Sequence, residues 1–127
     1  MTENELSRII VDSAFKIHTT FGPGLLESVY GAVLAHELEL RGLNVVCQQA
    51  IPVVYEEVQL EVGFRADIVV NGKVVIEVKS VEALAPVHAK QLQTYLKLMD
   101  LRLGLLINFN VDLIKNGIRR VVNGLRE

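Results

Sequence analysis

The order of helical and strand patterns along this chain predicts an α/β sandwich with a mixed sheet. Two helical segments come first, three strand segments joined by short turns follow, and a further helix and strand complete the order. Short turns join antiparallel strands, whereas a helical crossover joins parallel ones, so one sheet with both kinds of pairing is expected. Half of the 127 residues are hydrophobic and three are proline, a composition typical of a compact chain. This length predicts a single domain, residues 1–127.

The N-terminal third of the chain predicts two helices. Thr2 and Glu5 have the spacing of a capping box, and the apolar residues that follow recur at helical intervals, which predicts a helix to about Thr20. The sequence Phe-Gly-Pro-Gly at residues 21–24 ends that helix. A second apolar stripe predicts a helix that opens there and ends in a basic last turn and a glycine cap at residues 41–42.

The middle of the chain predicts three antiparallel strands. Residues 44–54 and 58–70 are rich in β-branched residues and flank a turn near Glu56 and Glu57, and a third strand, residues 73–80, follows an Asn-Gly turn. The single cysteine, Cys47, lies in the first of these segments, so a buried strand residue is expected there.

The C-terminal third predicts a helix and a buried strand. Pro86 suits the first position of a helix that runs to about Asp100. Residues 103–109 form a short continuous apolar run, which is typical of a strand buried on both faces. The segment from 113 to 125 is compatible with a strand or with a short irregular ending.

Charge is distributed unevenly between the two halves of the chain. Nine acids and three bases lie in residues 1–64, net −6, whereas six acids and ten bases lie in residues 65–127, net +4. A basic half favours contact with phosphates, although the net charge of −2 is not that of a dedicated nucleic-acid binder. The N-terminus lacks the pattern of a signal peptide, and no apolar stretch has the length of a membrane span, so a cytoplasmic protein without membrane contact is expected.

Three charged residues, Asp67, Glu77 and Lys79, interrupt an otherwise apolar hairpin. A loop at residues 70–72, with Gly72 left-handed, sorts the side chains into an apolar and a charged face. It pairs Val69 with Lys73, Asp67 with Val75 and Arg65 with Glu77. The expected apolar face holds Phe64, Ala66, Ile68, Val74, Ile76 and Val78, and the charged face holds Arg65, Asp67, Glu77 and Lys79. From these residues alone, a solvent-facing salt-bridge cluster and a metal site fit equally well.

The hairpin resembles the core motif of the PD-(D/E)XK nuclease superfamily, in which an Asp on one strand precedes Glu-x-Lys on the next. Here these residues are Asp67 and Glu77-Val78-Lys79. The segment from Gln91 to Tyr95 is similar to the Gln-x-x-x-Tyr helix of the RecB-like branch, and residues 24–30, Gly-Leu-Leu-Glu-Ser-Val-Tyr, match the signature of the GxxExxY proteins. The resemblance implies a restriction-endonuclease-like αβββαβ core, a mixed sheet flanked by helices, with an additional N-terminal helix.

The resemblance also implies a set of site residues. Glu27 joins Asp67, Glu77 and the backbone carbonyl of Val78 as ligands of Mg²⁺ or Mn²⁺, because all-oxygen sites suit these ions. Lys79 orients the attacking water, and Gln91 completes the catalytic set. The expected substrate contacts are Arg65, Tyr95 and His88.

Two functions follow from this resemblance. The first is metal-dependent hydrolysis of phosphodiester bonds in nucleic acid, with DNA as the expected substrate and a homodimer as a way to enlarge a small binding surface. The second is a non-catalytic module that uses the same fold to bind nucleic acid or a protein partner, because fold alone does not determine activity.

Overall fold

The computed structural model describes residues 1–60 and 63–126. Over these residues the elements are α1 (Glu3–Phe21), α2 (Glu27–Leu40), β1 (Val45–Ala50), β2 (Val53–Tyr55), β3 (Val58–Leu60), β4 (Arg65–Val70), β5 (Val74–Lys79), α3 (Pro86–Met99), β6 (Leu103–Asn108), the short 3-10 helix η1 (Ile114–Gly117) and β7 (Ile118–Val122). Within the described residues the main sheet has five strands in the order β1-β4-β5-β6-β7. Only β5 and β6 run parallel in it. The predicted mixed α/β fold with an additional N-terminal helix is confirmed.

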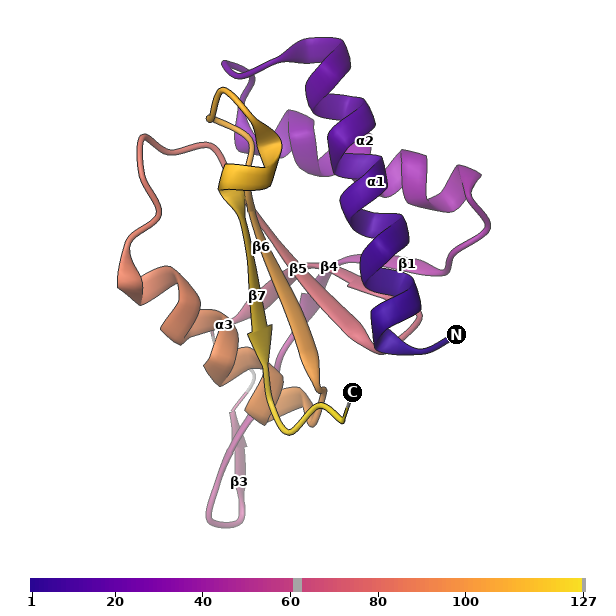
Figure 1. Ribbon diagram of the computed structural model, residues 1–127. Coiled ribbons are helices and arrows are strands. Elements are labelled where there is room, and N and C mark those ends of the chain that lie inside the picture. The colour runs from indigo at the N-terminus through magenta and orange to yellow at the C-terminus, as the bar shows by residue number, and fades with distance from the viewer. Residues whose placement is uncertain (61–62, 127) are drawn as a thin grey trace.

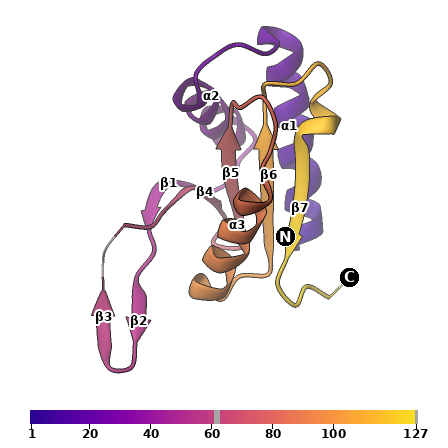
Figure 2. The same cartoon turned by 90° about the vertical axis from the view of Figure 1, so that its left-hand side faces the viewer.

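Helices cover both faces of this sheet. Figures 1 and 2 show α1 and α2 on one face and α3, which connects β5 to β6, on the other. The parallel pair β5–β6 is thus buried on both sides, as parallel strands require. All six residues of β6 are buried, which matches the apolar run that predicted this strand.

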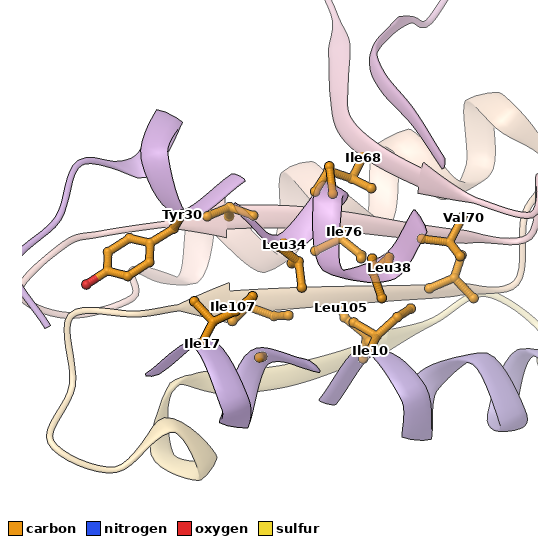
Figure 3. Close-up of a cluster of buried hydrophobic side chains, with 14 of the residues drawn as sticks. Ile10, Ile17, Tyr30, Leu34, Leu38, Ile68, Val70, Ile76, Leu105 and Ile107 are labelled. Carbon is orange, nitrogen blue, oxygen red and sulfur yellow. The ribbon is translucent and has the colours of Figure 1, made fainter. Parts of the chain in front are cut away.

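Two clusters of apolar side chains hold the layers together. The larger one fills the space between the sheet and the pair α1–α2, and Figure 3 shows Ile10, Leu34 and Ile76 among its members. The smaller one lies between the sheet and α3 and includes Leu92 and Val75. Every one of these five side chains is fully buried, and each such aliphatic side chain contributes roughly 1.5–3 kcal/mol through its burial.

The helices agree closely with the sequence-based boundaries. The Glu5 N–H donates to the Thr2 hydroxyl and the Thr2 N–H donates to the Glu5 carboxylate, both at 3.1 Å, which confirms the predicted capping box. Pro86 is the first residue of α3, as expected. The C-terminal segment, left open by the sequence, forms η1 and the antiparallel edge strand β7.

The two long predicted strands, 44–54 and 58–70, are interrupted in the structure. Pro52 separates β1 from β2, since proline cannot donate a ladder hydrogen bond. Gly63, with a φ of 91°, precedes β4, and residues 61 and 62 of the predicted strand lie outside the described residues. Within the part of the chain that the structure describes, β2 and β3 pair with each other as a separate hairpin.

The predicted register of the β4–β5 hairpin is wrong by two residues. The observed pairs are Ile68 with Ile76, Val69 with Val75 and Val70 with Val74, so the loop comprises residues 71–73. The cause lies outside the hairpin: the Asn71 side chain accepts a hydrogen bond from the Asn44 N–H, and the Asn71 N–H donates to the Asn44 carbonyl, both at 2.8 Å. These contacts keep Val70 in the ladder.

A shift of two residues preserves the side-chain faces of a strand, so much of the predicted sorting survives. Ile68, Val74, Ile76 and Val78 all lie in the α1–α2 cluster. Gly72 is left-handed as expected, with a φ of 62°.

The predicted apolar face does not extend past Asp67. Ala66 lies in the α3-side cluster, and the Phe64 ring packs on Tyr95 of α3 with ring centroids 5.6 Å apart. The β1–β4 pairing skips Gln48 and Asp67, and Gln48 has a φ of 52°. Because of this distortion the alternation of side chains is inverted at Asp67, so Ala66 lies on the α3 side although Ile68, two residues later, lies on the α1–α2 side.

Candidate functional site

Two carboxylates replace the backbone ladder where β4 and β5 separate. The last backbone-paired residues toward the site are Ile68 and Ile76. Beyond them the Asp67 N–H donates to Oε2 of Glu77 at 2.8 Å, and the Val78 N–H donates to Oδ2 of Asp67 at 2.9 Å. Each acid therefore accepts a backbone hydrogen bond across the strands, which fixes the two carboxylates beside each other. Arg65, which was expected opposite Glu77, does not occupy that position.

The same contacts orient the backbone of Val78. In a strand, the N–H and C=O of one residue point to the same neighbouring strand. Because the Val78 N–H points to Asp67, its carbonyl also points toward the gap between β4 and β5. This is the direction that a carbonyl ligand at the site requires.

A third carboxylate approaches from α2. Glu27 is the first residue of that helix, and its Oε1 accepts a hydrogen bond from the Ser80 N–H at 3.1 Å. The Ser80 hydroxyl donates to the carbonyl of Leu25 at 2.9 Å. Ser80 thus joins the end of β5 to the start of α2, next to Lys79.

Tyr30 fixes the loop that precedes α2. Its ring is fully buried and stacks on Phe109 with centroids 4.4 Å apart. Its hydroxyl donates to the Gly22 carbonyl and accepts from the Leu25 N–H. Tyr30 is therefore a core residue, and it holds in place the segment that carries Glu27.

A cavity of about 410 Å³ opens beside these groups, between α2 and the strands β1, β4 and β5. Its lining comprises Glu27, Ser28, Gly31, Ala32, Cys47, Gln48, Asp67, Ile68 and Val78. The small residues of α2 leave room for a ligand close to the carboxylates. The prediction that Cys47 is buried is wrong: it is exposed, because β1 is an edge strand that α2 does not cover at this point.

The site carries more negative charge than its surroundings compensate. Glu77 is 5 % exposed, and burial together with the Asp67 charge raises its pKa from 4.5 to about 7. Burial also raises the pKa of Asp67, against hydrogen bonds from Val78 and Gln48 that lower it. Glu27 raises and Lys79 lowers the pKa of both acids, so all four charges lie within electrostatic range of one another.

This donor set fits a hard divalent cation in its chemistry. All the expected ligands are oxygens, as Mg²⁺ and Mn²⁺ prefer, and the raised pKa of Glu77 indicates a place where a cation would be stabilised. Yet within residues 1–60 and 63–126 no three His, Cys, Asp or Glu side chains form a ready-made metal cluster. One oxygen each of Glu27, Asp67 and Glu77 is already engaged by a backbone N–H, which leaves the second oxygen of each carboxylate for a cation.

The remaining predicted residues differ in their relation to the site. Tyr95 is buried, and burial and the charges of Glu77 and Asp67 raise its pKa, so it lies near both acids from the α3 side. Gln91 is exposed on α3, across the sheet from α2. His88 accepts a hydrogen bond from the Ala85 N–H at the start of α3, and Arg65 donates to the Gln48 carbonyl at 3.3 Å.

Two contributors to the site were not identified from the sequence. Gln48 lines the cavity and bonds to Asp67, and Ser80 positions Glu27. The left-handed backbone of Gln48 leaves no signal in the sequence, because glutamine is not a residue that favours it. Ser80 follows the Glu-x-Lys motif directly in the sequence, and this position is the signal that could have identified it.

Among the described helices, none combines the length and the apolarity that crossing a bilayer requires. A search of curated protein sequences found no significant match. A solved structure entitled "Crystal structure of SSO0001" is similar with a TM-score of 0.48 and 17% sequence identity, covering 95% of this chain and 79% of that one. Comparison with protein-family models matches residues 4–121 to the PD-(D/E)XK nuclease superfamily. The match spans nearly the whole chain and includes every residue of the site described above, so the chain belongs to the PD-(D/E)XK nuclease superfamily.

Proposed function

We propose that this protein is a nuclease that hydrolyses phosphodiester bonds with the help of Mg²⁺ or Mn²⁺, and that its substrate is DNA. The observation that carries the proposal is the hydrogen-bonded pair of Asp67 and Glu77 at the point where the β4–β5 ladder ends. Burying two adjacent acids is unfavourable for folding, as the raised pKa of Glu77 indicates. A functional requirement for both acids explains why they stand there.

In this proposal Glu27, Asp67, Glu77 and the carbonyl of Val78 hold the cation. The cation supplies Lewis-acid chemistry: it polarises the phosphodiester and lowers the pKa of a water molecule. The protein's part is to keep Glu27, Asp67 and Val78 at one cavity, with the Glu77 carboxylate beside Asp67. The backbone bonds to Asp67 and Glu77 fix those two acids, whereas Glu27 is exposed and can turn toward the cavity.

The Lys79 ammonium group provides the positive charge of the catalytic set. It orients the attacking water and donates hydrogen bonds to the phosphoryl oxygens on which charge develops. The water oxygen bonds to phosphorus, the P–O ester bond breaks, and the proton that the water loses passes through solvent to the departing oxygen. Gln91 binds a ligand or the nucleic-acid backbone from α3. Arg65, Tyr95 and His88 are the proposed contacts to substrate.

We propose membership of the GxxExxY family from residues 24–30, in which Tyr30 fixes the loop before Glu27, and of the RecB-like branch from the Gln-x-x-x-Tyr segment at residues 91–95. We also propose that residues 1–127 act as one domain, as a cytoplasmic homodimer.

A second candidate is a non-catalytic module that binds nucleic acid or a protein partner. The observation that favours it is that the carboxylates of the described residues do not form a ready-made metal cluster. The two candidates differ in their dependence on Lys79, because a binding module needs no charge at the position where hydrolysis develops one.

Cleavage of a fluorescently labelled DNA duplex and of single-stranded DNA in Mn²⁺ tests the proposal, with Lys79→Ala as the variant and Lys90→Ala as a control. Lys90 is an exposed lysine of α3, so its loss removes the same charge elsewhere. The nuclease proposal predicts cleavage by the wild type and by Lys90→Ala, and a loss of at least about 100-fold in Lys79→Ala. No cleavage by the wild type, or equal rates in all three proteins, would favour the binding module.

A further inference from the structure

The β2–β3 hairpin stands away from the rest of the protein. In Figure 2 it projects from the ends of β1 and β4, and its two strands pack mainly against each other. The paired residues are Val53 with Leu60, Val54 with Gln59 and Tyr55 with Val58. Successive side chains of a strand point to opposite faces, so Val53, Tyr55, Val58 and Leu60 share one face, and every one of them has an apolar side chain or ring.

This apolar face is exposed to solvent. Tyr55 is 70% exposed, Val58 57% and Leu60 42%. A two-stranded hairpin by itself is at best marginally stable in water and needs a surface to pack on. Contiguous exposed apolar side chains, when they form a large patch, mark an interaction site on a protein surface. The hairpin therefore has the properties of an arm that packs on a partner.

The charges of the hairpin argue against nucleic acid as that partner. Its tip consists of Glu56 and Glu57, both exposed, and its residues 53–60 include no lysine or arginine. Binding to a phosphate backbone requires cationic side chains, and acidic ones repel it. An apolar and acidic arm instead fits an apolar surface with basic residues at its margin.

Such a surface lies next to the base of the hairpin. A groove of about 270 Å³ runs between the β1–β4 side of the sheet and the C-terminal end of α3, with the lining Gln49, Ala50, Pro52, Val69, Gly72, Leu98, Met99 and Leu101. Lys97 is exposed in the last turn of α3, whereas Arg102, which follows the helix, is paired with Asp100 at 2.9 Å, so Lys97 is the basic residue that we assign to the margin of the groove. Pro52 is both part of this groove and the residue before β2, so arm and groove adjoin. A two-fold axis near Pro52 would bring each arm onto the groove of the other copy.

We propose that the β2–β3 hairpin is a dimerisation arm, and that its apolar face packs in the groove beside α3 of a second copy of this chain. The acidic tip then approaches Lys97 of the other copy. We expect this contact to bury less than the roughly 1,200 Å² of a stable interface, so the dimer should form at high concentration and dissociate on dilution. This inference locates the interface of the homodimer included in the proposed function, but it rests on the hairpin and the groove alone.

Sedimentation velocity of the wild type from about 1 µM to about 1 mM tests the arm. Val58→Glu places a charge on the apolar face, and Val54→Glu is a matched control on the opposite face of the same hairpin, where Val54 is 62% exposed. We expect the wild type and Val54→Glu to approach twice the monomer mass of 14.1 kDa and Val58→Glu to remain monomeric. A monomeric wild type over the whole range, or equal association of the two variants, overturns the proposal.

Charge reversal identifies the occupant of the groove. A Glu56→Lys/Glu57→Lys protein and a Lys97→Glu protein should each self-associate less than the wild type. In a dimer of one copy of each, the arm with two lysines meets the groove with glutamate at position 97, and the unchanged acidic arm meets the unchanged Lys97. Both contacts then join opposite charges, so the mixture should associate more than either protein alone. No gain in the mixture contradicts the proposed docking of arm on groove. Mn²⁺ binding by monomeric Val58→Glu, measured in parallel, separates failure of the interface from failure of the nuclease proposal.

Discussion

Replacement of Glu77 by glutamine should stabilise the protein at alkaline pH, although it removes a proposed catalytic group. Glu77 is buried beside Asp67, and its pKa rises from 4.5 to about 7. The folded state therefore binds more protons than the unfolded state between these pH values, and the wild type loses stability as the pH rises through this window. The full effect is about 3 kcal/mol, since each pKa unit corresponds to about 1.4 kcal/mol.

Glutamine keeps a carbonyl oxygen that can accept the hydrogen bond of the Asp67 N–H, but it carries no charge. At pH 8 the free energy of unfolding of Glu77→Gln should exceed that of the wild type by about 3 kcal/mol, and at pH 5 by less than about 1 kcal/mol. Urea unfolding followed by circular dichroism, in EDTA, measures both values. A slope of about 1–3 kcal/mol per molar urea predicts a rise in the midpoint of roughly 1–3 M at pH 8.

Glu82→Gln is the matched control, because Glu82 lies in the loop directly after β5 and is exposed. Its replacement should change the stability by no more than about 0.5 kcal/mol at either pH. Equal stability of wild type and Glu77→Gln at pH 8 would refute the reasoning, as would a gain of the same size at both pH values. Either result would mean that the Glu77 charge is compensated in the folded state.

Three further predictions concern the metal, the loop before α2 and the core. Mn²⁺ at about 100 times its Kd should raise the wild-type unfolding free energy at pH 8 by about 2.7 kcal/mol and leave Asp67→Ala unchanged; a shift of equal size in both proteins argues against the site. Tyr30→Phe removes the hydroxyl that bonds to Gly22 and Leu25, so calorimetry should show a free energy of unfolding lower by about 1–3 kcal/mol. The same variant should bind Mn²⁺ more weakly, and unchanged binding would show that this loop does not position Glu27. Gly104→Ala puts a Cβ 2.8 Å from Cγ of Leu92 and should lower the free energy of unfolding by about 1–3 kcal/mol. Gly31→Ala should not lower it, because the Cβ at this position meets open space and the backbone is helical. Equal effects of the two substitutions would contradict this account of the core.

The helices were predictable because short-range signals define their ends. The capping box of Thr2 and Glu5 and the proline at the start of α3 act within one turn of the chain, so the sequence contains the whole signal. The order of elements, and hence the mixed sheet, follows from those helices and from the apolar run of β6.

The strand details were less predictable because they depend on distant parts of the chain. Asn44 fixes the start of the hairpin loop through Asn71, 27 residues away, and no local pattern contains that contact. The separation of β2–β3 from the sheet and the exposure of Cys47 likewise follow from which strands lie at the edge.

The candidate site was predictable in part for a simple geometric reason. The register error of two residues is an even number, so Asp67 and Glu77 still come together. Glu27 was identified by resemblance alone, and the contact that holds it, from Ser80, joins residues 53 positions apart. The cavity itself depends on the packing of α2 over β4, which periodicity does not specify.

Calorimetric titration with Mn²⁺ tests the central claim most directly, because it requires no knowledge of the substrate. The wild type and the variants Asp67→Ala and Glu77→Ala should be titrated at pH 8, alone and with a phosphorothioate DNA duplex, and Glu82→Ala serves as a control for loss of charge. Our account predicts saturable binding by the wild type and by Glu82→Ala that is lost in both site variants. Binding that persists in Asp67→Ala and Glu77→Ala, or no binding by the folded wild type with and without DNA, would contradict it.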